Sequence, residues 1–476
     1  MQFKISTASP KKSTILIIND ATQLLKSDML SAAEINYATA EIKKEKKIIS
    51  LNQYGRFVYI CLSPSGIALP VSESLRRMGC ALKDLLNKDK AINVIISNIS
   101  SESSAAYWLA EGITLASYQF LKYFSDTKKK NNSLSTIEFD KTSITLKDLN
   151  QLSIITESVS IARNLVNEPL NSMGAVELSR QIAALGKASG FKTTVLNKAQ
   201  ITKEKMGGIL AVNRGSIDPP TFSVMEYKPA KSLNKQPIVL VGKGIVYDTG
   251  GLSLKPTPNS MDRMKSDMSG AALVSAAMYA IAKLKLPLHV IALVPATDNR
   301  PGENAYVPGD VIKMYDGTNV EVLNTDAEGR MVLADTLHWA KRYKPELVLD
   351  FATLTGAAAA ITGGEALIYM GTAEDKIKLS FEKSGANQYE RMVQLPLWPE
   401  YGDMIKSDIA DLKNVGGPYG GAITAGKFLE HFTAYPWLHF DIAGVSFATA
   451  RKNYHSVGGT AFGLRMLLDY LLHYGK

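Results

Sequence analysis

The sequence predicts an α/β protein with two α/β domains joined by a long helix. Short β-branched runs alternate with longer amphipathic patterns along most of the chain, which is the order of elements found in α/β domains. One long helical pattern, followed closely by a proline, separates a shorter N-terminal part from a larger C-terminal part. The composition of the 476 residues, 46% hydrophobic and 21% charged, is that of a globular protein and excludes wholesale disorder.

Residues 1–143 are expected to form an N-terminal α/β domain. Its strands are expected at Ile15–Ile18, Phe57–Leu62 and Ile92–Ile96, and its helices at Ser72–Asn87 and Ala105–Phe124. Strands and helices that alternate in this way predict a sheet with helices packed against it.

Residues 144–166 are expected to form one connector helix. Apolar residues recur at near-helical spacing within Thr145–Leu165, at Leu149, Leu152, Ile155, Val159 and Ile161. Pro169 follows, and a proline disfavours the helical conformation of the residue before it. The pattern therefore predicts a rigid helix between two domains.

Residues 167–476 are expected to form a larger α/β domain around a central mixed sheet. The predicted strands are Thr221–Tyr227, Pro237–Val241, His289–Val294, Val311–Met314, Val320–Leu323 and Leu347–Phe351. The predicted helices are Ser269–Lys283, Arg330–Arg342 and Gly356–Thr362. The dipeptide Asp316-Gly317 is typical of a tight turn and predicts a hairpin between two of the strands.

Net charge and cysteine content limit the partners and the compartment. The formal net charge is +9, and residues 1–166 hold 21 basic and 15 acidic side chains, so most of the excess lies in that part. A solvated basic surface explains this excess most simply, and nucleic-acid binding is the alternative. Because the chain has only Cys61 and Cys80 and no run of 18 apolar residues, we expect a soluble cytoplasmic protein without disulfides or a membrane span.

The residues that point to chemistry are acids and lysines in apolar, glycine-rich surroundings. They fall in three clusters, which contain Lys243 and Asp248, then Asp267, then Asp326 and Glu328. The last two acids are two positions apart, so on an extended segment their carboxylates would share a face. Four crowded carboxylates would repel one another, and two divalent cations would remove that cost; oxygen ligands suit Mg, Mn or Zn. Any one of these acids alone is more often a helix cap or an ion-pair partner, and the spacing alone identifies no reaction.

A resemblance to a known family does indicate which reaction these residues would carry out. The segment 324–337, Asn-Thr-Asp-Ala-Glu-Gly-Arg followed by Met-Val-Leu-Ala-Asp-Thr-Leu, resembles the signature of the leucyl aminopeptidases, the M17 cytosol aminopeptidase family. Segments 242–248, 264–267, 350–356, 420–425 and 439–444 agree with it. The resemblance covers about residues 160–470, and it implies a macro-like N-terminal α/β domain, a connector helix and a catalytic α/β domain.

The resemblance also implies a dinuclear metal site. One metal would be held by Asp248, Asp326 and Glu328, and the other by Lys243, Asp248, Asp267 and Glu328. The expected cations are Mn or Zn, with Mg as a third candidate. The metals would activate a bridging hydroxide that attacks the first peptide bond of a substrate.

Further residues take roles from the same resemblance. Lys255 and Arg330 would be catalytic, and Arg330 would anchor a bicarbonate. Met264, Thr353, Gly356 and Ala443 would line the pocket for the first side chain of the substrate, which fits leucine and other apolar residues.

The expected protein is thus a leucyl aminopeptidase that assembles as a homohexamer. The alternative function is that of a DNA-binding regulator that uses the basic N-terminal domain, as some members of the family do.

Overall fold

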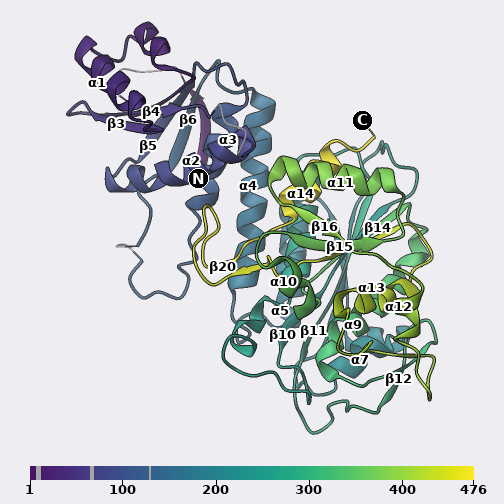
Figure 1. Cartoon of the computed structure of the whole chain (residues 1–476). Helices are drawn as coiled ribbons and strands as arrows, with labels where there is room; N and C mark the ends of the chain where they lie inside the picture. Colours follow the sequence, from purple (N-terminus) through teal and green to yellow (C-terminus); the bar gives the residue numbers. More distant parts are fainter. Residues whose placement is uncertain (7–11, 65–68, 128–129, 476) are drawn as a thin grey trace. The chain divides into compact units, whose positions relative to one another are not determined.

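The computed structural model describes residues 1–6, 12–64, 69–127 and 130–475, and it divides the chain into two compact units (Figure 1). Unit 1 comprises Met1–Ser160 and Ala450–Ser456, and unit 2 comprises Ile161–Thr449 and Val457–Lys476. The division falls within one helix, α4 (Leu146–Asn167). Each unit is built on its own β-sheet with packed helices, so the predicted α/β class is confirmed.

Unit 1 contains a six-stranded sheet in the order β1-β6-β5-β2-β4-β3. All neighbours are parallel except β3 and β4. The strands are β1 (Gln2–Ser6), β2 (Thr14–Ile18), β3 (Ile48–Asn52), β4 (Phe57–Leu62), β5 (Asn93–Asn98) and β6 (Thr136–Asp140). The helical elements are η1 (Ala21–Lys26), α1 (Ala32–Lys43), α2 (Val71–Lys88) and α3 (Ala105–Ala116).

The β-branched run at β2 is buried on both faces of the sheet. Ile15 and Ile17 join the core formed with α2 and α3, whereas Leu16 and Ile18 join the core formed with α1. A strand covered on both faces is expected to be a continuous apolar run, which is why β2 could be found in the sequence.

The helix expected at Ala105–Phe124 is wrong at its C-terminal end, because α3 stops at Ala116. The Ser117 hydroxyl donates to the Ile113 carbonyl, and the Asn132 amide donates to the Ser117 carbonyl. Side chains therefore satisfy the last carbonyls of the helix, and the chain turns away although apolar residues continue.

Unit 2 contains a nine-stranded mixed sheet, ordered β16-β15-β18-β14-β9-β11-β8-β7, with β10 also paired to β11. Its strands are β7 (Lys192–Leu196), β8 (Thr221–Tyr227), β9 (Ile238–Gly242), β10 (Gly244–Asp248), β11 (Val290–Asn299), β14 (Leu347–Ala352), β15 (Leu367–Gly371), β16 (Met392–Gln394) and β18 (Trp437–Asp441). The neighbours β11, β9, β14 and β18 run parallel, so their carboxyl ends share one edge of the sheet.

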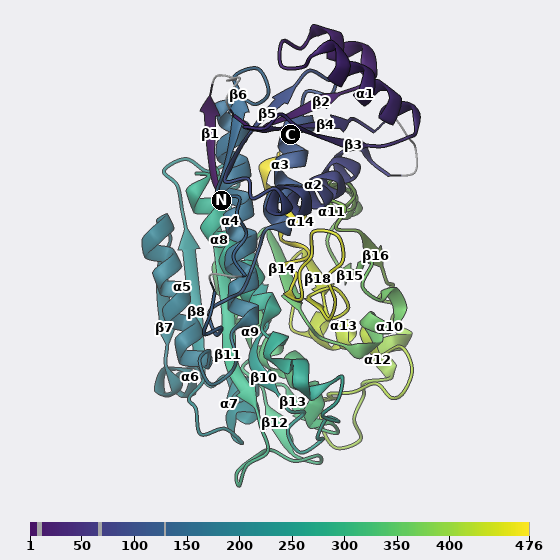
Figure 2. The same ribbon diagram turned by 90° about the vertical axis from the view of Figure 1, so that its left-hand side faces the viewer.

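Helices cover both faces of this sheet (Figure 2). The helices and 3-10 turns of unit 2 are α5 (Ala175–Ser189), α6 (Lys198–Glu204), α7 (Gly207–Asn213), η2 (Met261–Ser266), α8 (Ser269–Lys283), η3 (Thr325–Ala327), α9 (Glu328–Ala340), η4 (Lys341–Tyr343), α10 (Gly356–Thr362), α11 (Asp375–Gln388), α12 (Glu400–Asp403), α13 (Gly421–His431) and α14 (Leu464–Leu472). One apolar core of unit 2 lies between the sheet and α7, α9 and α13. No helix in the described part of the chain has the length and apolar character that crossing a membrane requires.

Two small sheets complete unit 2. The hairpin predicted at Asp316-Gly317 is confirmed: β12 (Val311–Lys313) pairs antiparallel with β13 (Asn319–Glu321), which also pairs with β17 (Leu412–Lys413). Gly317 has φ of 98°, a conformation that favours glycine. The second small sheet pairs β19 (Phe447–Ala448) with β20 (Gly458–Gly459) in antiparallel fashion. In the sequence these strands precede and follow Ala450–Ser456, the segment assigned to unit 1.

The contact between α2 and α3 yields a prediction for stability. A Cβ atom at Gly112 would lie 2.0 Å from the backbone carbonyl oxygen of Arg76. Alanine would add about 1 kcal/mol of helix propensity, but overpacking against backbone costs about 1–3 kcal/mol. We expect Gly112→Ala to lower the urea midpoint of unfolding, whereas Gly55→Ala, with no atom within 4 Å of the new Cβ, should not. Equal midpoints for the two variants would contradict this account of the packing.

Candidate active site

Polar residues gather where the parallel strands of unit 2 end. Lys243 directly follows β9, Asn299 ends β11, Thr353 directly follows β14 and Asp441 ends β18. In open α/β sheets, ligands bind outside the carboxyl ends of the strands. The topology therefore brings four chemically active positions to the edge of the sheet where a site is expected.

Lys243 lies at the centre of the first group of contacts. Its Nζ is 2.9 Å from both Asp267 Oδ1 and Glu328 Oε1, and it donates to the Thr353 carbonyl at 2.9 Å. The side chain is only 3% exposed. A Cβ atom at Gly329 would lie 2.6 Å from this Nζ, so glycine leaves the space that the amine occupies.

Lys255 forms the second group of contacts. Its Nζ is 2.9 Å from Asp248 Oδ2 and 2.5 Å from Asp326 Oδ1. One carboxylate oxygen from each of Asp248, Asp326 and Glu328 lies within 4.8 Å of the others, a spacing that suits a shared cation. The structure thus gathers all five residues of the expected ligand set, together with Lys255.

The acids of the 324–328 segment do not lie on an extended strand, so the expectation of a shared strand face is wrong. Residues Thr325–Ala327 form a 3-10 turn, and Glu328 is the first residue of α9. The Asn324 side chain accepts a hydrogen bond of 2.8 Å from the Asp326 backbone N–H and so caps the start of this turn. The carboxylates converge because the chain tightens into a helix at this point.

Reciprocal hydrogen bonds join this turn to the loop after β10. The Thr325 hydroxyl donates to the Gly250 carbonyl at 2.7 Å and accepts from the Ser253 backbone N–H at 2.8 Å. The Ser253 hydroxyl accepts from the Thr325 backbone N–H. Gly250 and Gly251 have φ of 86° and 62°, which allows the loop to fold back onto the turn.

Three further residues hold the acids in place, and sequence reasoning missed all of them. The Asn299 amide, fully buried, donates to Asp248 Oδ1 at 2.8 Å and to the Thr325 carbonyl at 3.0 Å. Tyr306 donates to the same carbonyl at 2.9 Å, and Asn414 donates to the carbonyl of Asn324 at 2.7 Å. Asn299 could have been found as a polar residue that ends a long apolar run.

Burial sets the electrostatics of the cluster. Removal from water raises the pKa of the Asp248, Asp267 and Asp326 carboxyls, and the charge of Glu328 adds to the rise. Burial alone lowers the pKa of the Lys243 ammonium, but the adjacent carboxylates outweigh burial and raise it. The carboxylates therefore cannot all be ionised without strong positive charge beside them.

Arg330 lies in the first turn of α9. Its guanidinium donates to the Asn414 carbonyl at 2.7 Å, and the side chain is 8% exposed. Burial lowers the pKa of Arg330 to about 10, opposed by the carboxylates of Glu328 and Asp441. Arg330 therefore remains a cation at neutral pH, and its Nε has no hydrogen-bond partner within the described ranges.

The four expected pocket residues lie on three segments around the cluster. Thr353 donates to Asp267 Oδ1 at 2.7 Å, and Met264 lies on η2, where its carbonyl accepts from the Asp267 N–H. Gly356 begins α10, and Ala443 follows β18. The structure thus ties Thr353 and Met264 directly to the cluster and places the other two on the loops that follow β14 and β18.

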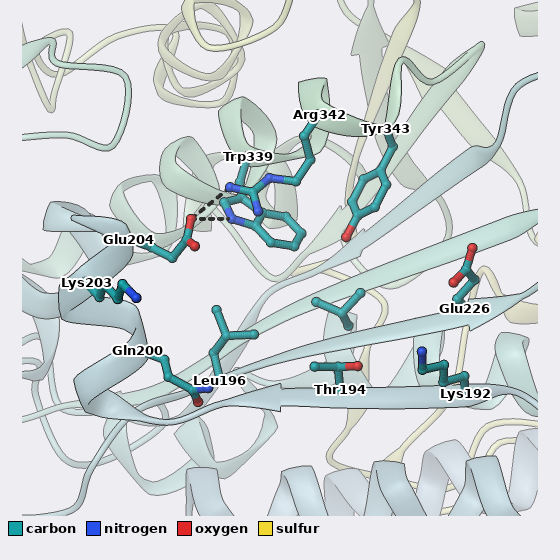
Figure 3. Close-up of a pocket in the computed structure, with 11 residues that line it drawn as sticks. Lys192, Thr194, Leu196, Gln200, Lys203, Glu204, Glu226, Trp339, Arg342 and Tyr343 are labelled. Carbon is teal, nitrogen blue, oxygen red and sulfur yellow. Dashed lines mark hydrogen bonds and ion pairs between the residues drawn. The ribbon is translucent and has the colours of Figure 1, made fainter.

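A separate hollow of about 430 Å³ lies over β7 and β8 (Figure 3). Glu204 pairs there with Arg342 at 2.8 Å and accepts from the Trp339 indole at 3.3 Å. Arg342 also lies over the indole ring, 3.8 Å from its centre. These side chains satisfy one another, and none of the expected site residues lines the hollow.

Comparisons with known proteins agree on one family. The family described as the cytosol aminopeptidase family, catalytic domain, matches residues 160–468. A probable cytosol aminopeptidase of Geobacter sulfurreducens is 38% identical over 459 residues, which cover 94% of this chain and 92% of the relative. The structure of a cytosol aminopeptidase from Coxiella burnetii aligns with a TM-score of 0.85 at 26% identity, covering 100% of this chain and 99% of that chain. The structure of the bottromycin maturation enzyme BotP in complex with Mn aligns with a TM-score of 0.84 at 28% identity. The alignment covers 97% of this chain and 99% of that chain.

The two hydrogen bonds of Asn299 yield a prediction for cation binding. Residues that orient ligands typically contribute about 10–100-fold to metal affinity. We expect Asn299→Ala to weaken the binding of Mn²⁺ to the metal-free protein within this range, because Asp248 and the Thr325 turn lose their common donor. Calorimetric titration measures the affinity.

Asn197→Ala is the matched control, because this asparagine caps the exposed helix α6 in the same unit. Its affinity for Mn²⁺ should equal that of the wild type. An Asn299→Ala protein that folds and binds Mn²⁺ as tightly as the wild type would show that Asn299 does not orient the ligand.

Proposed function

Because the chain belongs to the cytosol aminopeptidase family and is a metal-dependent aminopeptidase, we propose that it removes leucine and other apolar residues from the N-termini of peptides. The supporting observation is the carboxylate cluster of Asp248, Asp326 and Glu328, whose oxygens lie within 4.8 Å of one another; Asp248 and Glu328 are buried and Asp326 is partly exposed. Lys243 and Lys255 contact these carboxylates from two sides.

The donor set fits two divalent cations. Asp267 Oδ2 and Glu328 Oε2 are buried and have no hydrogen-bond partner among the residues described, which is costly unless another ligand is bound. We assign one cation to Asp248, Asp326 and Glu328, and the other to Lys243, Asp248, Asp267 and Glu328. When bound, the cations would lower the pKa of a shared water so that it can act as the nucleophile near neutral pH.

Lys243 changes its role with the cations. Without them its ammonium balances the charge of Asp267 and Glu328 at 2.9 Å. With them the charge is already balanced, and the amine can lose its proton and serve as a neutral ligand. Mn or Zn, with Mg as a third candidate, suits the oxygen-rich set, and the Mn²⁺ in the BotP complex supports Mn.

Two further cationic side chains would act on the substrate. Lys255 reaches the cluster from the loop after β10, where its ammonium can stabilise negative charge on the carbonyl oxygen of the bond under attack. Arg330 is buried and charged, and its Nε has no hydrogen-bond partner among the described residues; it would hold a bicarbonate that moves a proton between the attacking water and the leaving amine.

The expected pocket explains the proposed selectivity. Met264, Thr353, Gly356 and Ala443 carry no charge, so a charged first side chain would be desolvated without a partner. A branched apolar side chain such as leucine would be buried favourably. On the family resemblance, we further propose a homohexamer that works in the cytoplasm.

The test of the function is hydrolysis across a panel of aminoacyl amides. We expect leucyl amide to be among the best substrates, activity to disappear on chelation, and Mn²⁺ or Zn²⁺ to restore it. Glu328→Gln should reduce kcat/KM by at least about 100-fold, because the residue contributes to both proposed cation sites.

Glu303→Gln is the control, because it removes an exposed carboxylate outside the cluster and should leave kcat/KM unchanged. Activity that persists after removal of all metal, or full activity of Glu328→Gln, would refute the proposed mechanism.

A further inference from the structure

Asp441 joins the two loops that carry the expected substrate pocket. Its carboxylate is 1% exposed and lies at the carboxyl end of β18. Oδ1 accepts from the backbone N–H of Leu354 and of Ala443, both at 3.1 Å, and Oδ2 accepts from the Thr355 hydroxyl at 2.8 Å. One side chain therefore fixes the loop after β14 to the turn after β18.

The loop after β14 is held on its other side by the acidic cluster. Thr353 donates to Asp267 Oδ1 at 2.7 Å, and its carbonyl accepts from Lys243 at 2.9 Å. Thr355 also caps α10, because its hydroxyl accepts from the Ala358 N–H at 3.0 Å. The loop is thus hydrogen-bonded to the acidic cluster on one side and to Asp441 on the other.

The turn after β18 is packed equally closely. A Cβ atom at Gly444 would lie 2.4 Å from the Gly363 carbonyl oxygen and 3.1 Å from the Cα of Ala359. This turn therefore contacts α10 directly, and a small shift of either element changes the space between them.

We propose that Asp441 is a positioning residue that sets the separation of the two loops and so determines which first side chains the enzyme accepts. The proposal rests on the proposed function, since the expected pocket residues Thr353 and Ala443 lie on these loops and Gly356 begins α10 directly after the first of them. Without the carboxylate, two partly buried N–H groups and one hydroxyl lose their acceptor. The loops would then separate, and the pocket would distinguish less well between side chains of different size.

The test measures kcat/KM for the p-nitroanilides of leucine and of alanine. The Mn²⁺-loaded wild type is compared with the Asp441→Ala and Asp441→Asn variants. We expect Asp441→Ala to lower the leucine-to-alanine ratio of kcat/KM by about tenfold, mainly through a higher KM for the leucyl substrate, because one or two buried methylenes contribute about this much to selectivity. Asp441→Asn keeps an acceptor for both backbone N–H groups and can donate to Thr355, so its ratio should stay within about threefold of the wild type.

Asp335→Ala is the matched control. Asp335 is also a buried aspartate that accepts two backbone N–H groups, from Ile209 and Tyr315, but it lies on α9 away from both loops. Its loss should lower the thermal stability without changing the leucine-to-alanine ratio. If Asp441→Ala does not fold, Thr355→Val removes one donor to the same carboxylate and should shift the ratio in the same direction.

The outcomes separate this proposal from the proposed function. A wild type that cleaves neither substrate would contradict the function itself. A parallel loss for both substrates in Asp441→Ala, with an unchanged ratio and normal Mn²⁺ affinity, would show that Asp441 is structural and would overturn the positioning role.

Discussion

The candidate site of unit 2 depends on four carboxylates gathered at one edge of its sheet, three of them buried (Asp248, Asp267 and Glu328) and one, Asp326, partly exposed. Removing an ionised carboxylate from water costs several kcal/mol unless opposite charge is close. Lys243 and Lys255 lie within 2.9 Å of these acids, and burial still raises the pKa of Asp248 and Asp267. The two ammonium groups therefore balance only part of the charge, and the remaining demand is what would draw divalent cations into the site.

The parallel strands of unit 2 bring the acidic cluster and the residues around it to one edge of the sheet. The carboxyl ends of β9, β11, β14 and β18 share one edge because these neighbours run parallel. Neutral donors complete the edge: Asn299 orients Asp248, and Asn414 holds the loop that leads to Asp326. Amides orient a carboxylate without changing its charge, and among the described residues the buried Glu328 Oε2 has no hydrogen-bond partner.

The sequence predicted the parts of this arrangement that depend on local pattern. The alanine-rich helix Ser269–Lys283 and the hairpin at Asp316-Gly317 are confirmed, and the two α/β units match the predicted class. The 324–337 segment alone indicates the family, which the match over residues 160–468 confirms. Asn299 and Asp441 were missed, because Asp248, Thr325, Leu354 and Thr355, which they contact, are remote in sequence and become neighbours only in the folded chain. The end of α3 was missed because the Asn132 side chain terminates it from 15 residues away.

Divalent cations would replace the lysine charge in the acidic cluster, and one titration tests this replacement directly. Metal-free protein is titrated with Mn²⁺ near pH 7 by calorimetry, in two buffers of different ionisation enthalpy, which gives the stoichiometry and the protons released. We expect two Mn²⁺ per chain and the release of at least one proton, because Lys243 would have to become neutral to serve as the proposed ligand. Binding of fewer than two cations, or binding without proton release, would contradict it.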